Sequence, residues 1–233
     1  MNKRFGEYAH RGDYHINPEK DWPYLPVYLE KMKIARKFLD DCKPDEVIFD
    51  MGCGEGVLVN HYRKAGYNIT GMDLNYSSDV IIQRNFLNTE IADNSVDVIV
   101  CTDVIEHLIF SDQEKAFAEF ARILKPGGRA LISVPNLAHL ASRISFMFTG
   151  KLVRTSGIDR HPGDRPAGEY VKMIQKHFRI TSRRGVFPTF PVLSIFTVIM
   201  PSNVIWLHKI YNTLLAWPNW CFLNVFQIEK PSA

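Results

Sequence analysis

A short apolar segment that runs directly into three closely spaced glycines is the feature that most restricts this sequence. Glu46 to Asp50 has the length and apolar content of a buried strand, and GCGEG (Gly52 to Gly56) follows. Val57 to Gly66 then has the pattern of a short helix, and Tyr67 to Met72 that of a second strand. Glycines between a strand and a helix N-terminus allow a ligand to approach free backbone N–H groups. The segment therefore predicts a βαβ unit with a ligand site at its turn.

Further apolar segments continue this alternation. An amphipathic helix, Val27 to Cys42, precedes the first strand, and Ser111 to Glu114 has the pattern of a capping box that opens another helix. Alternating strands and helices build a mostly parallel sheet with helices on both faces. We therefore predict a single doubly wound α/β domain over residues 1–233. The other predicted elements are the strands Val80 to Gln83, Val96 to Cys101 and Arg129 to Val134 and the helix Leu137 to Phe148.

An acidic residue, Asp73, follows the second predicted strand. A carboxylate at the carboxyl end of such a strand can accept hydrogen bonds from both hydroxyls of a ribose. The glycines have the spacing G-x-G-x-G and are followed by Val57, which departs from the dinucleotide pattern G-x-G-x-x-G. A nucleoside-containing ligand is predicted, and a nicotinamide oxidoreductase is a weaker interpretation.

Four segments together resemble the seven-stranded, class I family of S-adenosylmethionine-dependent methyltransferases. The closest branch is that of small-molecule and ubiquinone-pathway O-methyltransferases. The segments are VIFDMGCGEG, GMDLN, NSVDVIVCTDVIEHL and LKPGGRALISVPN, in the order that the family has. The resemblance covers roughly residues 24–187. It implies a Rossmann-like sheet of seven strands, with Leu223 to Glu229 as the last strand, and S-adenosyl-L-methionine as the cofactor.

The same resemblance implies the cofactor contacts. Residues of the first strand and its turn would cradle the methionine part, and the acid after the second strand would hold the ribose. Near the third strand the family usually has an Asp against the adenine, whereas this chain has RNFLN, and an Asn carbonyl can accept the same hydrogen bond. The implied residues are Asp50, Gly52, Cys53 and Gly54 for methionine, Asp73 for ribose, Asn85 or Asn88 for adenine, and Leu74 and Asp103 as further cofactor contacts.

Two histidines are candidate catalytic bases, because a neutral hydroxyl acceptor would need to lose a proton during methyl transfer. His161 lies in RHPGDRP, a segment expected near the carboxyl edge of the sheet, and is the preferred base. His107 follows the fourth strand. Their alternative roles are a turn residue and a helix start. In some ubiquinone-pathway relatives an acid, a Glu and a His at this spacing are implicated in metal binding. Asp103, Glu106 and His107 fit that spacing loosely, and no metal ion is assigned.

Residues 187–228 include one formal charge, Lys209, and nine aromatic residues. They predict an apolar insertion over residues 188–220 before the last strand, too interrupted by proline for a membrane-spanning helix. Three interpretations remain open: a lid over an apolar acceptor, a patch in a membrane interface, or a homodimer surface. Residues 143–233 have a net charge of +8, against −5 for residues 1–142. Interfacial Trp and this basic surround favour a membrane over nucleic acid, which is not an expected partner.

The main prediction is an S-adenosylmethionine-dependent methyltransferase that acts on an oxygen of a small, apolar or lipid-linked acceptor, such as a glycolipid or a quinone-like molecule. The alternatives are a non-catalytic S-adenosylmethionine-binding module and a membrane-associated interaction protein. The four cysteines lack metal or redox spacing and the N-terminal stretch lacks an apolar leader, so we expect a cytoplasmic location, including the inner face of a membrane. Monomer and homodimer both remain open.

Overall fold

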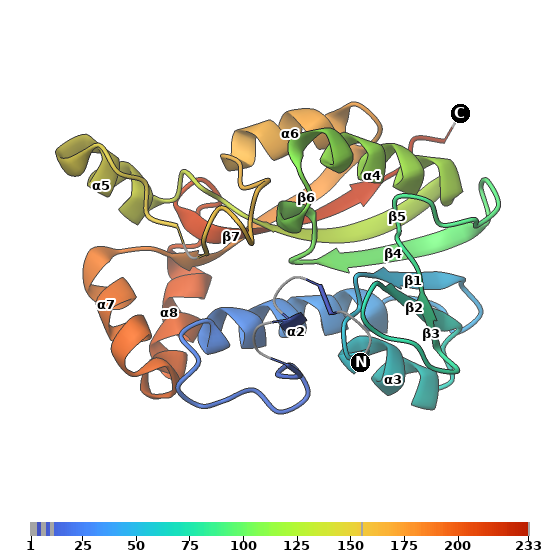
Figure 1. Cartoon of the computed structure of the whole chain (residues 1–233), viewed down its shortest axis with the longest axis horizontal. Helices are drawn as coiled ribbons and strands as arrows, with labels where there is room; N and C mark the ends of the chain where they lie inside the picture. The colour runs from blue at the N-terminus through green and yellow to red at the C-terminus, as the bar shows by residue number, and fades with distance from the viewer. Residues whose placement is uncertain (1–3, 6–7, 10–11, 155, 233) are drawn as a thin grey trace.

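A central sheet with helices on both faces organises the molecule (Figure 1). The computed structural model describes residues 4–5, 8–9, 12–154 and 156–232. Its strands are β1 (Ile48–Met51), β2 (Ile69–Asp73), β3 (Ile81–Gln83), β4 (Val96–Thr102), β5 (Leu124–Pro135), β6 (Arg179–Pro188) and β7 (Cys221–Glu229). They form one sheet of order β3-β2-β1-β4-β5-β7-β6, in which only β7 runs antiparallel to its neighbours. The predicted doubly wound, mostly parallel α/β fold with seven strands is confirmed.

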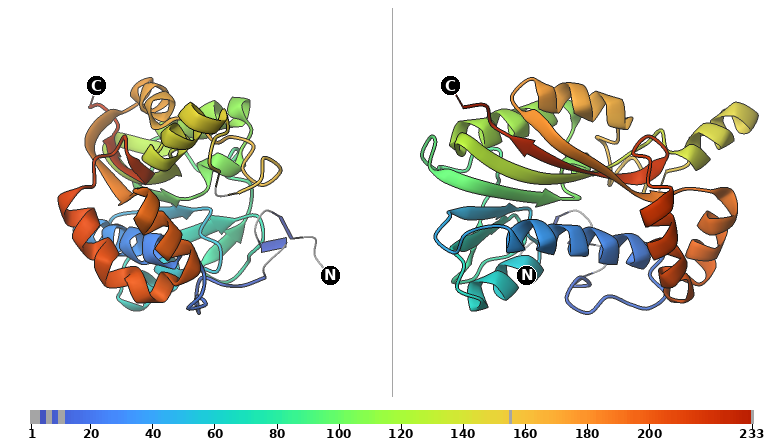
Figure 2. Two further views of the ribbon diagram at one scale, coloured as in Figure 1. Left: turned by 90° about the vertical axis from the view of Figure 1, so that its left-hand side faces the viewer. Right: turned by 180° about the vertical axis from the view of Figure 1, so that it is seen from behind.

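Helices form a layer on each side of this sheet (Figure 1). One layer holds α2 (Leu25–Asp40) and α3 (Val57–Lys64), and the other holds α4 (Phe110–Ile123) and α6 (Ala167–Gln175). A single turn of 3₁₀ helix, η1 (Ile105–His107), follows β4. The remaining helices gather at one end of the molecule (Figure 2) and are α5 (Leu140–Thr149), α7 (Pro191–Ile199), the 3₁₀ helix η2 (Pro201–Val204) and α8 (Ile205–Leu214).

The central strand β4 explains why the sheet is buried on both faces. Its side chains alternate in direction, as in any strand. Val98 and Val100 pack in the core beneath α2 and α3, whereas Ile99 and Cys101 pack in the core beneath α4 and α6. All four are fully buried, which accounts for the unbroken apolar run in the sequence.

The predicted βαβ unit is present at β1, α3 and β2, and these strands pair in parallel. β1 begins two residues later than predicted and includes Met51. The turn between β1 and α3 contains Gly52, Gly54 and Gly56, whose φ angles are 74°, 53° and 72°. These are left-handed conformations that only glycine adopts at little cost. The glycine spacing therefore fixes the path of the backbone between strand and helix.

The capping box predicted at Ser111 is wrong. α4 begins at Phe110, so Ser111 already lies inside the helix, and the residue before the helix, Ile109, makes no side-chain cap. Gln113 turns inward instead, and its amide nitrogen donates to the carbonyl oxygens of Ile105 (3.0 Å) and Gly163 (2.8 Å). Gln113 therefore makes buried hydrogen bonds to distant residues and takes no part in a helix cap.

The segment between β6 and β7 is a helical excursion. Pro188 and Cys221 are register partners at the ends of the two strands, and the chain between them forms α7, η2 and α8. The apolar insertion predicted over residues 188–220 thus folds into short helices. Within the ranges that the structure describes, no helix is long and apolar enough to cross a membrane.

Candidate active site

The glycine turn after β1 is joined to the end of β2 by backbone and carboxylate hydrogen bonds. Gly52 N–H donates to the carbonyl oxygen of Met72 (2.7 Å). Gly54 N–H donates to Asp73 Oδ2 (2.8 Å), and Asn75 N–H donates to Asp73 Oδ1 (2.7 Å). A carboxylate has about four acceptor positions, so Asp73 can still accept two hydroxyl protons. The turn and Asp73 are thus prearranged as one unit.

The glycines also leave no space for side chains. A Cβ added at Gly52 would lie 2.4 Å from Val104 Cγ2, and one added at Gly54 would lie 1.8 Å from the Tyr8 hydroxyl oxygen. Glu55, the residue between the last two glycines, accepts hydrogen bonds from the backbone N–H groups of Tyr14 (2.8 Å) and His15 (2.6 Å). Sequence reasoning missed this N-terminal covering segment, because no local pattern links residues 40 positions apart.

Asp50 lies next to this turn at the end of β1 and is buried, with 4% of its surface exposed. Burial and, to a lesser extent, the negative charge of Asp73 raise the pKa of Asp50 to about 7, against the opposing effect of Lys31. Burial likewise raises the pKa of the neighbouring Cys53 thiol, which therefore remains neutral. Asp50 is a buried carboxylate whose charge depends on a nearby cation.

The predicted adenine contacts lie beyond β2. Leu74 follows Asp73 directly and is 40% exposed, which leaves an apolar surface beside the carboxylate. Arg84 N–H donates to the carbonyl oxygen of Asp73 (2.9 Å), which holds the next segment close. Asn85 and Asn88 are exposed there, but Asn85 Oδ1 accepts from Leu87 N–H (3.0 Å) within its own turn. Asn88 is the amide whose side chain is not drawn into that turn.

Asp103, at the end of β4, has a left-handed backbone with φ 56°. Its carboxylate accepts hydrogen bonds from Tyr24 Oη (2.5 Å), from Lys31 Nζ (2.6 Å) and from the Ser133 hydroxyl. Burial alone would raise the pKa of Asp103, but Lys31 and these hydrogen bonds hold it below its usual range. The sequence indicated Asp103 and missed its three partners. The signal for Lys31 is its position in an amphipathic helix, where it is 4% exposed.

The two candidate bases meet although 54 positions separate them in the sequence. The rings of His107 and His161 are nearly perpendicular, with centroids 4.6 Å apart. His161 Nδ1 lies 3.4 Å from Asp164 Oδ1. The loop that contains His161 and Asp164 is held against η1, because Gly163 N–H donates to the carbonyl oxygen of Glu106 (3.1 Å). We call Glu106, His107, His161 and Asp164 the acid–histidine cluster.

Three buried atoms of the acid–histidine cluster have no hydrogen-bond partner in the described structure: Glu106 Oε2, His161 Nδ1 and Asp164 Oδ1. Buried polar atoms are normally paired, so this concentration indicates a place for polar groups of a ligand. Burial and the charges of Asp103 and Asp164 raise the pKa of Glu106 well above its usual range. The cluster therefore combines an acid held neutral with two imidazoles.

A metal ion could also be held here. Glu106, His107 and His161 offer ligand atoms that all lie within 4.8 Å of one another. The set that the resemblance implied had Asp103 in place of His161. In the structure the Asp103 carboxylate instead contacts Lys31 and Tyr24, and the loop of residues 156–166 brings His161 to the position beside Glu106.

These residues fit S-adenosylmethionine. The glycine turn has no side chains at Gly52, Gly54 and Gly56 to keep a ligand from its backbone, Asp73 retains acceptor positions for a ribose diol, and Asp50 offers a buried carboxylate to the methionine ammonium. The acid–histidine cluster follows β4, whose carboxyl end lies beside that of β1. An acceptor bound at the acid–histidine cluster would therefore lie on the same side of the sheet as the cofactor, at neighbouring strand ends.

Comparison of the sequence with known proteins identifies the family to which the chain belongs. The family described as "Methyltransferase domain" matches residues 27–178, more than half of the chain. The chain is 29% identical over 134 residues to the Ubiquinone biosynthesis O-methyltransferase of Rickettsia bellii (strain OSU 85-389), covering 52% of each protein. It is 34% identical over 113 residues to the Probable tRNA methyltransferase 9B of Mus musculus, covering 43% of this chain and 24% of that protein. The chain thus spans about half the length, or less, of these curated relatives.

Solved structures share the fold. The PH0226 protein from Pyrococcus horikoshii OT3 has a TM-score of 0.63 at 13% identity, with 97% of this chain and 100% of that chain covered. A SAM dependent methyltransferase from Archaeoglobus fulgidus has a TM-score of 0.55 at 18% identity, with 87% and 93% covered. The family match favours an enzyme over a non-catalytic module and over a nicotinamide oxidoreductase. The chain belongs to the methyltransferase domain family, has a Rossmann-like fold, and has S-adenosylmethionine as the cofactor that this family implies.

Proposed function

We propose that this methyltransferase transfers a methyl group to a hydroxyl oxygen of a small, apolar or lipid-linked acceptor. The observation that carries the proposal is the ion-pair contact of His161 Nδ1 with Asp164 Oδ1 (3.4 Å), in a buried cluster where neither atom has a hydrogen-bond partner in the described structure. The name of the Rickettsia bellii relative, an O-methyltransferase of ubiquinone biosynthesis, supports oxygen as the methylated atom. The name of the murine relative gives tRNA as the acceptor instead. The proposal of a hydroxyl acceptor therefore rests on the geometry of the acid–histidine cluster.

The bound cofactor supplies an electrophilic methyl group. The protein must align the acceptor oxygen with it and remove the hydroxyl proton, and alignment alone is worth up to ~7–11 kcal/mol in model reactions. His161 directs Nδ1 toward Asp164, so Nε2, on the other side of the ring, accepts the acceptor's proton. Asp164 then stabilises the imidazolium, as a carboxylate does for a general-base histidine elsewhere. His107 packs its ring edge-on against His161, and its Nδ1 is hydrogen-bonded to the carbonyl oxygen of Arg160 (2.9 Å), so it holds the base in position.

The test is methyl transfer from methyl-labelled S-adenosylmethionine to hydroxylated, quinone-like acceptors in detergent, with the product identified by NMR. We expect an O-methyl product, and we expect His161→Asn to lower turnover by about 10²–10³-fold without changing cofactor affinity. The loss should shrink at high pH, where the hydroxyl ionises by itself. The control is His61→Asn, an exposed histidine on α3. Methylation at carbon or nitrogen, or equal turnover of both variants at every pH, would refute the proposal.

A chelator separates the two roles open to His161. If His161 is the base, turnover in EDTA equals turnover in buffer. The opposite result is a loss of turnover in EDTA that added Mn²⁺ or Mg²⁺ reverses in the parent but not in Glu106→Gln. This result would make His161 a metal ligand and would overturn its assignment as the base.

A further inference from the structure

Exposed apolar side chains gather at the end of the molecule formed by α5, α7 and α8. Sixteen of the 24 large apolar residues that are exposed in the described chain lie in residues 146–153 and 192–220. In α7, only Leu193 and Thr197 are buried. We call this surface the apolar end, and its most exposed members are Phe146, Met147, Phe148, Val192, Ile195, Val198, Ile199, Trp206 and Leu214. A helix that faced only water would have polar residues at these positions.

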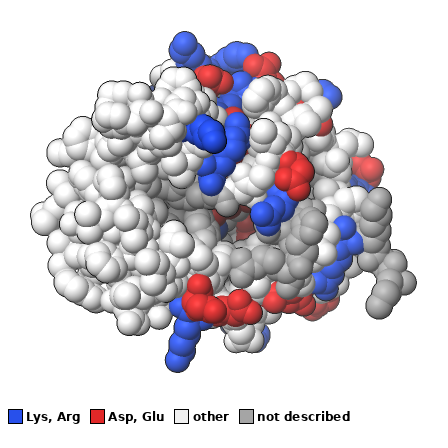
Figure 3. Space-filling view, turned by 60° about the vertical axis from the view of Figure 1, so that its left-hand side comes forward, with Lys and Arg blue, Asp and Glu red and all other residues white. Residues whose placement is uncertain are grey.

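The apolar end lies at the same edge of the sheet as the active site. α5 follows the carboxyl end of β5 and α7 follows that of β6, while β7 begins there because it runs antiparallel. A chain of contacts joins the two regions. Tyr24 donates to Asp103, its ring packs against Phe222 (6.1 Å between centroids), and Phe222 packs against His139 at the start of α5. Figure 3 shows the molecule hollowed beside this pale surface.

The charged residues within the segments that form the apolar end are all basic. Residues 140–158 contain Arg143, Lys151 and Arg154 and no acidic residue, and residues 188–228 contain only Lys209. Of these four, Arg154 pairs with Asp164. In Figure 3 basic side chains border the broad uncharged surface on its upper side, and acidic and basic side chains together border it below. Apolar side chains surrounded by Lys and Arg match the chemistry of an anionic lipid surface.

Tryptophan occupies the border of this surface. The rings of Trp217 and Trp220 are 4.5 Å apart and nearly perpendicular, and with Arg183 they line a shallow pocket. Arg183 is held toward this pocket by hydrogen bonds to Asn224 Oδ1 and Asn219 Oδ1, each 2.9 Å long. Trp rings and guanidinium groups are the groups that contact lipid headgroups at a bilayer interface.

A second copy of this chain fits the apolar end less well. A twofold interface brings the same patch against itself, so Arg143, Lys151 and Lys209 would face their own copies with no acidic partner in either segment. The helices also project as separate lobes, with α5 extending away from the body (Figure 2). Protein interfaces need complementary shapes, whereas fluid lipid fills the space between projecting helices.

We infer that the apolar end is a membrane-interface docking surface that seats the active-site edge on an anionic lipid bilayer. α5 and α7 insert their apolar side chains below the headgroups, and Arg143, Lys151 and Lys209 contact lipid phosphates. A lipid-linked acceptor then reaches the site without passing through water. The docking surface gives the proposed acceptor a source, but docking itself does not depend on methyl transfer.

The test is cosedimentation of the full chain, without cofactor or acceptor, with phosphatidylcholine vesicles that contain or lack phosphatidylglycerol. We expect binding to the anionic vesicles, and we expect Ile195→Glu and Phe148→Glu each to weaken it by at least about tenfold. Lys209→Gln should weaken it about fivefold, and only on anionic vesicles at low salt. Ile82→Glu is the control with the same charge change. Ile82 is exposed on β3, the outermost strand on the side of the sheet away from β6 and β7.

Two results would overturn the inference. One is equal partitioning of the folded parent, Ile195→Glu and Ile82→Glu, or no partitioning at all. The other is a parent that is dimeric by sedimentation equilibrium and does not bind vesicles, together with a monomeric Ile195→Glu, which would assign the surface to a second copy. Because no turnover is measured, failure here leaves the proposed methyl transfer untouched, and failure of methyl transfer leaves docking untouched.

Discussion

At the scale of single residues, Asp50 and Asp103 show how one cation sets two carboxylates apart. Both are held at the carboxyl edge, at the ends of β1 and β4. Lys31 Nζ contacts Asp103 at 2.6 Å and keeps its pKa low, whereas Asp50 has only a more distant attraction to Lys31 and has its pKa raised to about 7. Asp103 is therefore permanently charged near neutrality, and Asp50 is free to change its charge when a cationic group approaches.

Cofactor affinity should consequently depend on pH through Asp50. The methionine ammonium favours the ionised carboxylate, so binding at a pH below about 7 must first remove a proton from Asp50. We expect the affinity for S-adenosylmethionine to fall by up to tenfold for each pH unit below about 7 and to level off above about 8. Calorimetry in buffers of different ionisation enthalpy measures the released proton. Asp50→Asn should bind more weakly at high pH and lose this dependence, and a slope unchanged in that variant would contradict the assignment.

Asp73 should supply a different contribution to cofactor affinity, through hydrogen bonds from the two ribose hydroxyls. Removing an acceptor of two ribose hydroxyl bonds costs about 1.5–3 kcal/mol, so Asp73→Ala should weaken binding of S-adenosylmethionine and S-adenosylhomocysteine alike by roughly 10- to 100-fold. Calorimetry with both ligands measures this. The matched control is Asp79→Ala, an exposed acid in the same loop region. Equal affinities of these two variants would show that Asp73 does not hold the ribose.

The residues of the site differ in how far the sequence predicts them. Gly52 and Asp73 follow from local geometry, since a left-handed turn needs glycine and a strand end presents its next side chain at the sheet edge. The contacts of Lys31 and Ser133 with Asp103 could not be predicted, because each residue reaches Asp103 from an element far away in the chain, and the position of Lys31 in its amphipathic helix marks the residue but not its partner. The contact of His161 with Glu106 and His107 depends on an irregular loop, for which no periodicity exists.

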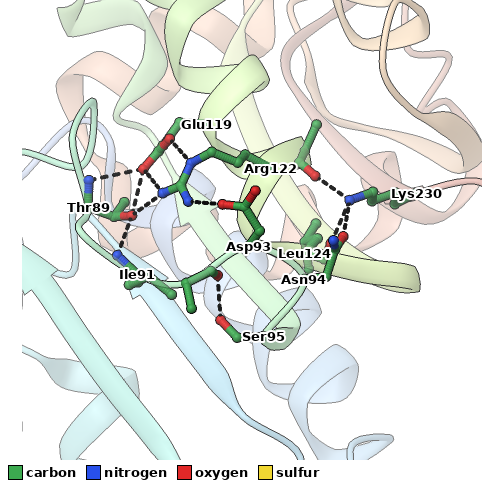
Figure 4. Close-up of polar contacts among 11 residues, drawn as sticks. Thr89, Ile91, Asp93, Asn94, Ser95, Glu119, Arg122, Leu124 and Lys230 are labelled. Atoms are coloured by element: carbon green, nitrogen blue, oxygen red, sulfur yellow. Dashed lines mark hydrogen bonds and ion pairs between the residues drawn. The ribbon is translucent and has the colours of Figure 1, made fainter.

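At the scale of elements, α4 is anchored near the amino ends of β4 and β5, whereas the active site lies at the carboxyl ends of the strands (Figure 4). Arg122 donates to Glu119 through Nε and Nη2, both at 2.7 Å, and Glu119 accepts from Thr89 N–H at 3.0 Å. Lys230, just after β7, donates to the carbonyl oxygens of Ala121 (2.6 Å) and Leu124 (2.8 Å) at the end of the helix. This network joins the helix to the loop before β4 and has no contact with the site.

Arg122→Ala should therefore affect stability and not cofactor binding. The hydrogen bonds from Arg122, together with those from Thr89, lower the pKa of Glu119 to about 2, so the stability gained from these contacts is complete above about pH 4.5 and is lost as the pH falls through about 2. We expect the free energy of unfolding to fall by about 1 kcal/mol at neutral pH, since the pair is partly exposed to solvent. Urea denaturation measures this difference.

A matched substitution on the same helix gives the comparison. Lys115 contacts Asp112 three positions away but is mostly exposed, so Lys115→Ala should change the free energy of unfolding by less than about 0.5 kcal/mol. If both variants unfold alike, the Arg122 network contributes no more than an ordinary surface ion pair.

At the scale of the whole molecule, two chemistries share one edge of the sheet: a polar site with glycines and carboxylates, and an apolar surface. The sequence predicts the fold because the strand–helix alternation is repeated along the chain, and it predicts the apolar character of residues 188–220 from composition. It does not predict that α5 joins α7 and α8 in one surface. That arrangement follows from strand order, since β7 lies between β5 and β6 and so brings the ends of all three together.

The register of β6 with β7 has a consequence for chain entropy. Because Pro188 and Cys221 face each other across the two strands, the excursion between them begins and ends at one point in space. The entropic cost of closing such a loop grows only with the logarithm of its length, by about 0.6 kcal/mol for each doubling. Lengthening or recomposing this excursion therefore costs the sheet little, and the helices at this turn can diverge in sequence while the strands that frame them keep their pairing.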